Sequence, residues 1–297
     1  MLCTSNRPLQ LFIRVIQAGT ISAAAKQEHI AAAALSRRIS DLEEQVGIPL
    51  VERSNKGLKA TPAGHALIDR AHRILNDLGA LQTHLQVYGS GEKGYLRIHA
   101  NLSAISQFLP AELGAFLRSH PNIQIDLADR TSTDIAQAVA ENAADIGVLV
   151  MDEPIKDLTY LPYRSDELVI ITSRHHPLAK RRKVRFEETL DFPYVGLPQG
   201  SQMNLQLARS ALALNRIWRC RFQVSGYGAL CLMVEADLGA GVLPRRVAQT
   251  QAKALQIHVL ELNEPWAKRQ LHLCIRSHAS LSPAAKLLVS HMTPEPA

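Results

Sequence analysis

The 297-residue sequence predicts two parts of different fold class: an α-helical N-terminal domain with a long linker helix, and a C-terminal α/β domain of two lobes. Three observations support this prediction. Up to residue 85, apolar residues recur every three or four positions, as in amphipathic helices. From residue 94, short apolar strands alternate with helical segments, which is typical of sheets covered by helices. Between these parts, residues 89–94 are rich in glycine and indicate a flexible linker.

Composition and charge indicate an ordinary globular protein. Hydrophobic residues make up 46% of the chain and charged residues 20%, and no apolar run approaches the ~20 residues of a membrane helix. Arg14 interrupts the apolar N-terminal stretch, so we expect no signal peptide and a cytoplasmic location. The net charge of +6 permits an anionic partner without requiring one. Cys3, Cys220, Cys231 and Cys274 lack CxxC or zinc spacing, so we expect reduced thiols, no metal and no cofactor.

Three short helices are predicted before residue 47. Gly19 and Gly47 end the first and the third, because glycine readily adopts the left-handed backbone of a helix terminus. Ser22 is expected to cap the second helix, which begins at Ala23. The core-facing stripe of the third helix consists of apolar residues at intervals of four, three and four: Leu35, Ile39, Leu42 and Val46.

The face of the third helix opposite this stripe carries Ala33, Arg37 and Ser40. Two helices joined by a short turn, the second presenting polar and basic residues, describe a helix-turn-helix whose second helix enters the major groove of DNA. Arg37 would pair there with guanine or phosphate. A plain helical bundle with a solvated basic face is the alternative that the residues leave open.

A β-hairpin is predicted over residues 49–60, where the turn-forming run Ser-Asn-Lys-Gly separates two short apolar segments. It would carry Arg53, Lys56 and Lys59 beside the third helix, as a wing that reaches phosphate or a minor groove. A solvated surface hairpin is the alternative.

At this point the chain resembles the LysR type of bacterial transcription regulator over about 60 residues. The motifs that carry the resemblance are Leu11-Phe12, Ala23-Ala24-Ala25, Leu35-Ser36-Arg37-Arg38-Ile39, Leu42-Glu43, Gly47-Ile48-Pro49-Leu50-Val51-Glu52-Arg53 and Thr61-Pro62-Ala63-Gly64. The resemblance implies a winged helix-turn-helix, residues 1–60, that binds double-stranded promoter DNA as a homodimer or homotetramer. We expect the DNA contacts from Ser22, Ala32, Ala33, Ser36, Arg37, Arg38, Arg53, Lys56 and Lys59.

The start of the third helix departs from the family pattern. The family usually has Ser or Thr, Gln and Pro, where this sequence has Ala31, Ala32 and Ala33. Ala31 has no side chain to cap the helix, and Ala32 cannot hydrogen-bond a base edge. We therefore expect DNA readout through Ser36, Arg37, apolar contacts and DNA shape.

A linker helix is predicted from Pro62, with Thr61 as its N-cap. Its narrow apolar stripe has the spacing of a coiled-coil seam, so we expect residues 61–93 to form a dimerising helix followed by the flexible linker. The stripe consists of Leu67, Ala71, Ile74, Leu78, Leu81 and Leu85. The GxGxxG match over residues 89–94 follows a helix and opens a strand, the reverse of a dinucleotide site, so it predicts no such site.

The C-terminal part is predicted to contain nine strands and five helices, in parallel sheets covered by helices. The helices are expected near 104–119, 132–142, 202–214, 227–238 and 281–292. Pro162 and Pro265 are the expected crossover points, so lobe I would comprise 94–161 with 267–297, and lobe II 162–266. The resemblance agrees, and it implies a periplasmic-binding-protein-like effector domain. The supporting motifs are Leu96-Arg97-Ile98, Leu109-Pro110, His120-Pro121, Asp145-Ile146-Gly147, His176-Pro177-Leu178-Ala179 and Gly239-Ala240-Gly241-Val242-Leu243-Pro244.

An effector pocket is predicted where polar residues follow strands and begin helices. Hydroxyl groups and backbone N–H groups at helix N-termini suit a small carboxylate or similar oxyanion. The candidates are Asn101, Ser103, Thr131, Ser132, Gln199, Ser201, Gln202 and Tyr227. Family resemblance favours Ser103 and Ser132 among them. Each residue could instead only cap its helix.

Two other classes of function fit the sequence less well. An enzyme is disfavoured because the histidines lack HExxH or other metal spacing and no GxSxG or P-loop is present, so we expect no catalytic residues. A solute-binding protein would need a signal peptide and no DNA-binding head. A small-molecule binder or enzyme that keeps the fold without specific DNA recognition stays as the alternative.

Overall fold

The computed structural model describes residues 6–54, 57–90, 94–150 and 154–293, with the backbone alone for residues 53–54, 80 and 82–90. The chain forms two compact units, Met1–Leu85 with Glu141–Ala143, and Gln86–Ala140 with Ala144–Ala297. Each unit is described by itself. No helix among the described residues is both long and apolar enough to span a membrane.

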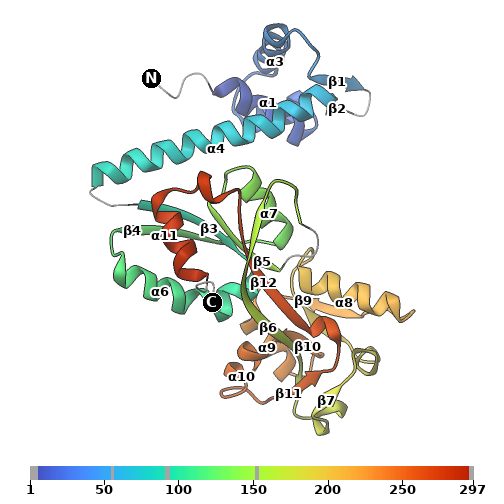
Figure 1. Cartoon of the computed structure of the whole chain (residues 1–297). Coiled ribbons are helices and arrows are strands. Elements are labelled where there is room, and N and C mark those ends of the chain that lie inside the picture. The colour runs from blue at the N-terminus through green and yellow to red at the C-terminus, as the bar shows by residue number, and fades with distance from the viewer. Residues whose placement is uncertain (1–5, 55–56, 91–93, 151–153, 294–297) are drawn as a thin grey trace. The chain divides into compact units, whose positions relative to one another are not determined.

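The first unit contains the expected helices and hairpin (Figure 1). Leu11, Phe12 and Leu35 are fully buried where the first three helices meet. Gly19 and Gly47 have positive φ angles, 71° and 75°, which confirms both as left-handed helix ends. The elements are α1 (Arg7–Ala18), α2 (Ile21–Gln27), α3 (Ala32–Val46), β1 (Val51–Ser54), β2 (Gly57–Ala60) and α4 (Pro62–Ser90).

Three details of the first unit differ from the sequence prediction. The N-cap of α2 is Thr20, whose hydroxyl accepts from the Ala23 backbone N–H at 3.2 Å, so Ser22 is not the cap. Val46 is 47% exposed, so the buried stripe of α3 ends at Leu42. Helix α4 continues to Ser90, so residues 89 and 90 of the predicted linker are helical, and residues 91–93 lie outside the described residues.

The start of α4 packs closely against the start of the hairpin. Thr61 caps α4 by accepting from the Gly64 N–H at 3.0 Å, and its hydroxyl donates to the Pro49 carbonyl at 2.9 Å. A Cβ atom on Gly64 would lie 2.2 Å from the Leu50 carbonyl oxygen, so only glycine permits this approach. Glu43 of α3 accepts from the backbone N–H groups of Leu50 and Val51 and holds the same corner.

The second unit is built on a mixed sheet in which two strands are shared. The order is β4-β3-β5-β12-β6-β11-β7, with β10 also on β6. The first half of β6 pairs antiparallel with β12, and its second half pairs antiparallel with β10 and β11. The expectation of wholly parallel sheets is therefore wrong, although β4, β3 and β5 are parallel. The bounds are β3 (Gly94–Ala100), β4 (Ile123–Asp129), β5 (Ile146–Val150), β6 (Thr159–Ser173), β7 (Lys183–Val184), β8 (Tyr194–Gly196), β9 (Cys220–Gln223), β10 (Gly241–Pro244), β11 (Ile257–Leu262) and β12 (Lys268–Ile275).

Helices cover the sheet and enclose three hydrophobic clusters, two in lobe I and one in lobe II. In lobe I, α6 and α11 cover one face of β3 and β5, and α7 covers the other (Figure 1). In lobe II, α8, α9 and α10 surround Ile170, Tyr194 and Leu243. The helix predicted over 104–119 is broken at Phe108 into α5 and α6, and α10 was not predicted. The bounds are α5 (Leu102–Gln107), α6 (Leu109–Ser119), α7 (Ser132–Ala140), α8 (Gln202–Ala213), α9 (Tyr227–Glu235), α10 (Arg245–Gln251) and α11 (Pro283–Met292).

Strands β6 and β12 contribute to both lobes, and we call them the crossing strands. Pro162 lies inside β6, opposite His272 at a register shift of β12. Pro265 lies in a short 3-10 turn just before β12. The lobe boundaries at these prolines stay a prediction, because backbone pairing runs past Pro162 without a break in the strand.

Candidate DNA interface and effector cavity

Helix α3 presents a small, partly basic surface at its N-terminal half. Because Leu35 and Ile39 face the core, the residues between them turn outward: Arg37 and Arg38 are exposed and Ser36 is half-buried. Ala32 and Ala33 are exposed in the first turn. The N-cap residue Ala31 makes no side-chain hydrogen bond, as its side chain predicts.

Ion pairs of Glu28 hold the end of α2 next to the turn that leads into α3. His29 adopts a left-handed backbone with φ of 52°, which reverses the chain tightly. The carboxylate of Glu28, at the end of α2, lies 2.9 Å from Arg7 Nη2 and 3.1 Å from Arg14 Nε of α1. These two ion pairs join the end of α2 to α1, just before the chain turns into α3.

The hairpin places only part of its predicted basic set within the described residues. Lys59 is exposed on β2, opposite Glu52. The Leu58 N–H donates to the Gly19 carbonyl at 2.8 Å and fixes the hairpin to the end of α1. The side chain of Arg53 and the whole of Lys56 lie outside the described residues. Ser22 is exposed near the start of α2.

The predicted dimerisation stripe divides into two parts. Leu67 packs against the core of the first unit and Ala71 is fully buried, so these two positions serve packing within the chain. Ile74 is 47% exposed and Leu81 43% exposed. Leu78 is half-buried, and the Leu85 side chain lies outside the described residues. Dimerisation through the exposed part stays a prediction.

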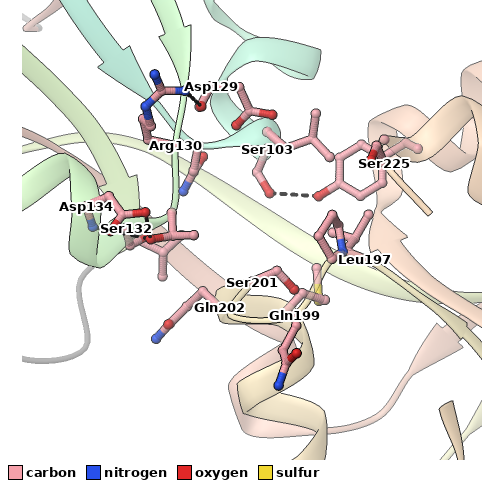
Figure 2. Close-up of a pocket in the computed structure, with 18 of the residues that line it drawn as sticks. Ser103, Asp129, Arg130, Ser132, Asp134, Leu197, Gln199, Ser201, Gln202 and Ser225 are labelled. Atoms are coloured by element: carbon pink, nitrogen blue, oxygen red, sulfur yellow. Dashed lines mark hydrogen bonds between the residues drawn. The ribbon is translucent and has the colours of Figure 1, made fainter. Parts of the chain in front are cut away.

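All eight predicted effector residues line one cavity of about 540 Å³ between the two lobes of the second unit (Figure 2). The cavity lies where β3, β4, β8 and β9 end and where α5, α7, α8 and α9 begin. It thus follows the strand-end rule on which the prediction rested. The eight residues are Asn101, Ser103, Thr131, Ser132, Gln199, Ser201, Gln202 and Tyr227.

Three of these residues cap helices. Asn101 accepts from the Ala104 N–H at 2.9 Å, and Thr131 accepts from the Asp134 N–H at 3.2 Å. Ser201 accepts from the Asn204 N–H at 3.3 Å. Capping therefore occupies one acceptor site on each of these side chains, whereas Ser103 and Ser132 cap nothing.

Ser132 and Ser103 differ in what their hydroxyl groups contact. Ser132 Oγ is buried and has no hydrogen-bond partner among the described residues. Ser103 Oγ lies 3.0 Å from the hydroxyl of Tyr227, the contact drawn as a dashed line in Figure 2. Burial raises the pKa of Tyr227 to about 12, so its hydroxyl keeps its proton at neutral pH.

Arg269 is a lining residue that the sequence analysis missed. Its Nη2 donates to Ser103 Oγ at 3.0 Å, and its Nε donates to Asp166 Oδ1 at 2.8 Å. Arg269 Nη2 also contacts Asp166 Oδ2. The alternation of side chains along β12 could have indicated that Arg269 points inward, because it lies on the same face as buried Leu271 and Leu273.

The cavity has little net charge from its side chains. The lining contains two arginines, Arg130 and Arg269, and two aspartates, Asp129 and Asp134, and Arg269 is also ion-paired with Asp166. Burial raises the pKa of Asp129, and the Asp134 carboxylate accepts from the Thr131 hydroxyl at 2.8 Å. A positive electrostatic potential that attracts an anion must therefore come from the N-terminal ends of α7, α8 and α9, whose first residues line the cavity.

Comparison with known proteins gives a consistent result for both units. A family model described as "LysR substrate binding domain" matches residues 89–296. A second, described as "Bacterial regulatory helix-turn-helix protein, lysR family", matches residues 7–65. The HTH-type transcriptional regulator YbhD of Escherichia coli (strain K12), itself described as uncharacterized, is 27% identical over 94% of this chain and 87% of that protein.

Solved structures share the fold. The crystal structure of CbnR, a LysR family transcriptional regulator, has a TM-score of 0.66 at 21% identity, covering 97% of this chain and 98% of that one. Full-length CbnR is also solved in complex with target DNA, again with a TM-score of 0.66 at 21% identity, covering 97% and 99%. The effector-binding domain of QuiR in complex with shikimate has a TM-score of 0.59 at 21% identity, covering 68% and 96%.

Proposed function

Because this chain belongs to the LysR family of bacterial transcription regulators, we propose that α3 and the hairpin bind promoter DNA and that the cavity between the lobes binds the effector. The protein is a DNA-binding transcription regulator that responds to a small molecule. It acts in the cytoplasm, without enzymatic activity, as a homodimer or homotetramer joined through the exposed part of α4.

The DNA-binding half of this proposal rests on the exposed N-terminal half of α3. Arg37 and Arg38 reach base edges or phosphates, and the methyl groups of Ala32 and Ala33 pack on thymine methyl groups. Lys59 contacts phosphate from the hairpin. With few hydrogen-bonding side chains in the first turn, much of the specificity comes from DNA shape.

One observation carries the effector half: the buried hydroxyl of Ser132, at the start of α7, has no partner among the described residues although it lines the cavity. Buried polar groups are almost always hydrogen-bonded, so a ligand atom or water belongs there. Balanced side-chain charge and three helix N-termini favour a small hydroxylated acid with one carboxylate.

Effector binding is transmitted by a change in the population of lobe arrangements. The lining residues come from both lobes, so a ligand that contacts both favours one relative position of the lobes. That shift alters how the oligomer bends its DNA.

The DNA-binding proposal is tested by selecting sheared genomic DNA on the full-length protein and sequencing what survives competitor at physiological salt. We expect a few promoter sites with two-fold symmetry. Arg37→Ala should lower affinity and reduce the slope of log affinity against log salt by about 1. Arg118→Ala removes an exposed charge on α6 and should change neither. Uniform, salt-sensitive DNA binding with no enriched site, both with and without added hydroxylated monocarboxylic acids, would favour the alternative. That alternative is a small-molecule-binding protein without specific DNA recognition.

The effector proposal is tested by calorimetric titration of a panel of hydroxylated monocarboxylic acids into the full-length protein. Ser132→Ala should weaken the best ligand about tenfold, because a buried hydrogen bond to a charged group is lost. Ser290→Ala, at an exposed position of α11, should have no effect. An unchanged affinity in Ser132→Ala would show that the ligand binds elsewhere.

A further inference from the structure

A second cavity of about 540 Å³ lies against the crossing strands. Six charged side chains line it: Asp166, Glu167, Arg245, Arg246, Lys268 and Arg269. The carboxylates come from β6, and the cations come from β12 and the first turn of α10. Four positive charges therefore face two negative ones in one concave surface.

Each carboxylate of this cavity is already engaged by an arginine. Glu167 forms a two-pronged pair with Arg245, at 2.7 Å to Nε and 2.9 Å to Nη2. Asp166 pairs in the same way with Arg269, and its side chain is only 1% exposed. Among the described residues, neither carboxylate forms an ion pair with Arg246 or Lys268, although the charge of Lys268 helps to lower the pKa of Glu167.

Arg246 and Lys268 have no carboxylate partner among the described residues. The guanidinium of Arg246 lies over the Phe108 ring, 5.2 Å from its centroid, which fixes the group without satisfying its N–H donors. Lys268 is exposed at the start of β12. Two unpaired cations beside two neutral ion pairs give an excess of two positive charges.

A buried acceptor in the same lining is also unsatisfied. Gln107 donates its Nε2 to Asp166 Oδ2 at 3.0 Å and to the Ser103 carbonyl at 3.1 Å. Its Oε1 is buried and has no donor among the described residues. A ligand that suits this cavity would combine two negative charges with a hydroxyl group.

We propose that the cavity at the crossing strands is a second ligand site, which binds a small dianion carrying an O–H group between Arg246 and Lys268. Hydrogen phosphate and hydroxylated dicarboxylates both have this chemistry. Such an anion gains charge-assisted hydrogen bonds from both cations, and these are about twice as strong as neutral ones. The effector cavity differs, since its own lining charges cancel.

The two cavities share Arg269. Its guanidinium binds Asp166, which lines the second cavity, and donates to Ser103 Oγ, which lines the effector cavity. A dianion that attracts Arg269 away from Asp166 also changes the hydrogen bond on Ser103. The second site thus regulates effector affinity, and by linkage the effector changes dianion affinity by the same factor. This regulatory part rests on the proposed function, whereas dianion binding does not.

Binding is tested by calorimetry on the full-length protein in a buffer free of phosphate, at constant ionic strength. The probes are inorganic phosphate, malate, succinate and acetate. We expect phosphate or malate to bind, succinate more weakly because it lacks the hydroxyl, and acetate least because it carries one charge. Lys268→Ala and Arg246→Ala should each weaken binding about tenfold, as expected for a lost bond between charged groups. Lys253→Ala, an exposed lysine after α10, is the matched control and should bind normally.

Several outcomes would overturn the site. They are no binding of either dianion, equal binding of acetate, or equal affinity in the Lys268→Ala, Arg246→Ala and Lys253→Ala proteins. Loss of phosphate binding in Ser132→Ala or Arg37→Ala, but not in Lys268→Ala, would place the anion in the effector cavity or on α3 instead.

Regulation is tested separately, by titrating the best monocarboxylic acid with and without saturating dianion. A change in its affinity of fivefold or more, about 1 kcal/mol, that disappears in Lys268→Ala supports coupling, and no change refutes it. If no monocarboxylic acid binds at all, the proposed effector class fails while the dianion titration still decides the second site.

Discussion

Replacing Asp166 with asparagine tests how strongly the crossing strands depend on one buried ion pair. The Asp166 side chain is 1% exposed and that of its partner Arg269 is 11% exposed. Asparagine keeps the shape and one acceptor oxygen but removes the charge. The mostly buried guanidinium of Arg269 is then left with two neutral acceptors, Asn at position 166 and Ser103 Oγ.

The structure sets the expected size of this effect. Removing one partner of a buried pair costs about 3–5 kcal/mol, because the other charge stays buried without compensation. The hydroxyl of Ser103 and the slight exposure of Arg269 place Asp166→Asn near the lower limit, about 3 kcal/mol. The double variant Asp166→Asn/Arg269→Gln removes both charges and should lose only about 1 kcal/mol, the value of a neutral hydrogen bond.

The assay is urea unfolding of the full-length protein, followed by tryptophan fluorescence. Both tryptophans, Trp218 and Trp266, pack against the lobe II core, so the signal reports on the second unit. Glu187→Gln is the control, because its contact with Arg185 is 3.9 Å long and both side chains are more than half exposed. It should change the free energy of unfolding by less than about 0.5 kcal/mol.

Two results would refute this reasoning. If Asp166→Asn lost less than about 1 kcal/mol, Arg269 would have to be solvated despite its burial in the structure. If the losses measured in Asp166→Asn and in Arg269→Gln alone added up in the double variant, the two side chains would not be energetically coupled.

Three further predictions concern other parts of the chain. Gly64→Ala should cost about 2–3 kcal/mol in thermal unfolding of the first unit, because its Cβ would lie 2.2 Å from the Leu50 carbonyl oxygen. Ala31→Ser supplies the missing cap of α3, worth ~1 kcal/mol, and should slow amide hydrogen exchange of that helix about fivefold. Burial lowers the pKa of His176 from 6.5, so the unfolded chain binds the proton more readily, and stability should fall as pH drops below 6.5. His176→Asn keeps an acceptor for the Leu178 N–H and should flatten that loss in urea unfolding across pH.

Each of these has an outcome that would contradict it. A fully stable Gly64→Ala protein would mean that α4 can move away from the hairpin at no cost. Unchanged exchange in Ala31→Ser would show that the first turn of α3 is already satisfied. An acid-side slope that is identical in His176→Asn would assign the loss of stability to other groups, such as His99 or His272, whose pKa values burial also lowers.

That the eight polar residues line one cavity could be predicted, because their meeting depends on a rule of topology rather than on side-chain detail. Polar residues that follow strands and begin helices meet at one edge of a sheet, so Ser103 and Ser132 were placed without knowledge of the strand order. The helix-turn-helix could also be predicted from the sequence, since Leu35 and Ile39 repeat at helical spacing and Gly47 ends the helix.

Other features depended on information that local sequence does not carry. Pro162 is an expected crossover point between the lobes, and the sequence does not show that a single strand, β6, runs through it to Ser173, because its partners on β12 lie a hundred residues away. Arg269 was missed for the same reason, because its role depends on hydrogen bonds to Asp166 and Ser103, which are close to it only in the folded chain. Helix α10 was missed since it is only seven residues long, with a weak apolar pattern.

The continuity of β6 and β12 also limits how the lobes can move. Two loose loops would let the lobes swing apart freely, but here β6 and β12 form a two-stranded antiparallel ribbon from Thr159 to Glu167, with one register shift beside Pro162. Such a ribbon yields by torsion about its own axis more readily than by folding at one point. Effector binding would then rotate one lobe against the other through a small angle, and the twisted ribbon would return the lobe when the effector leaves. The amide groups of the ribbon would stay protected from hydrogen exchange in both states.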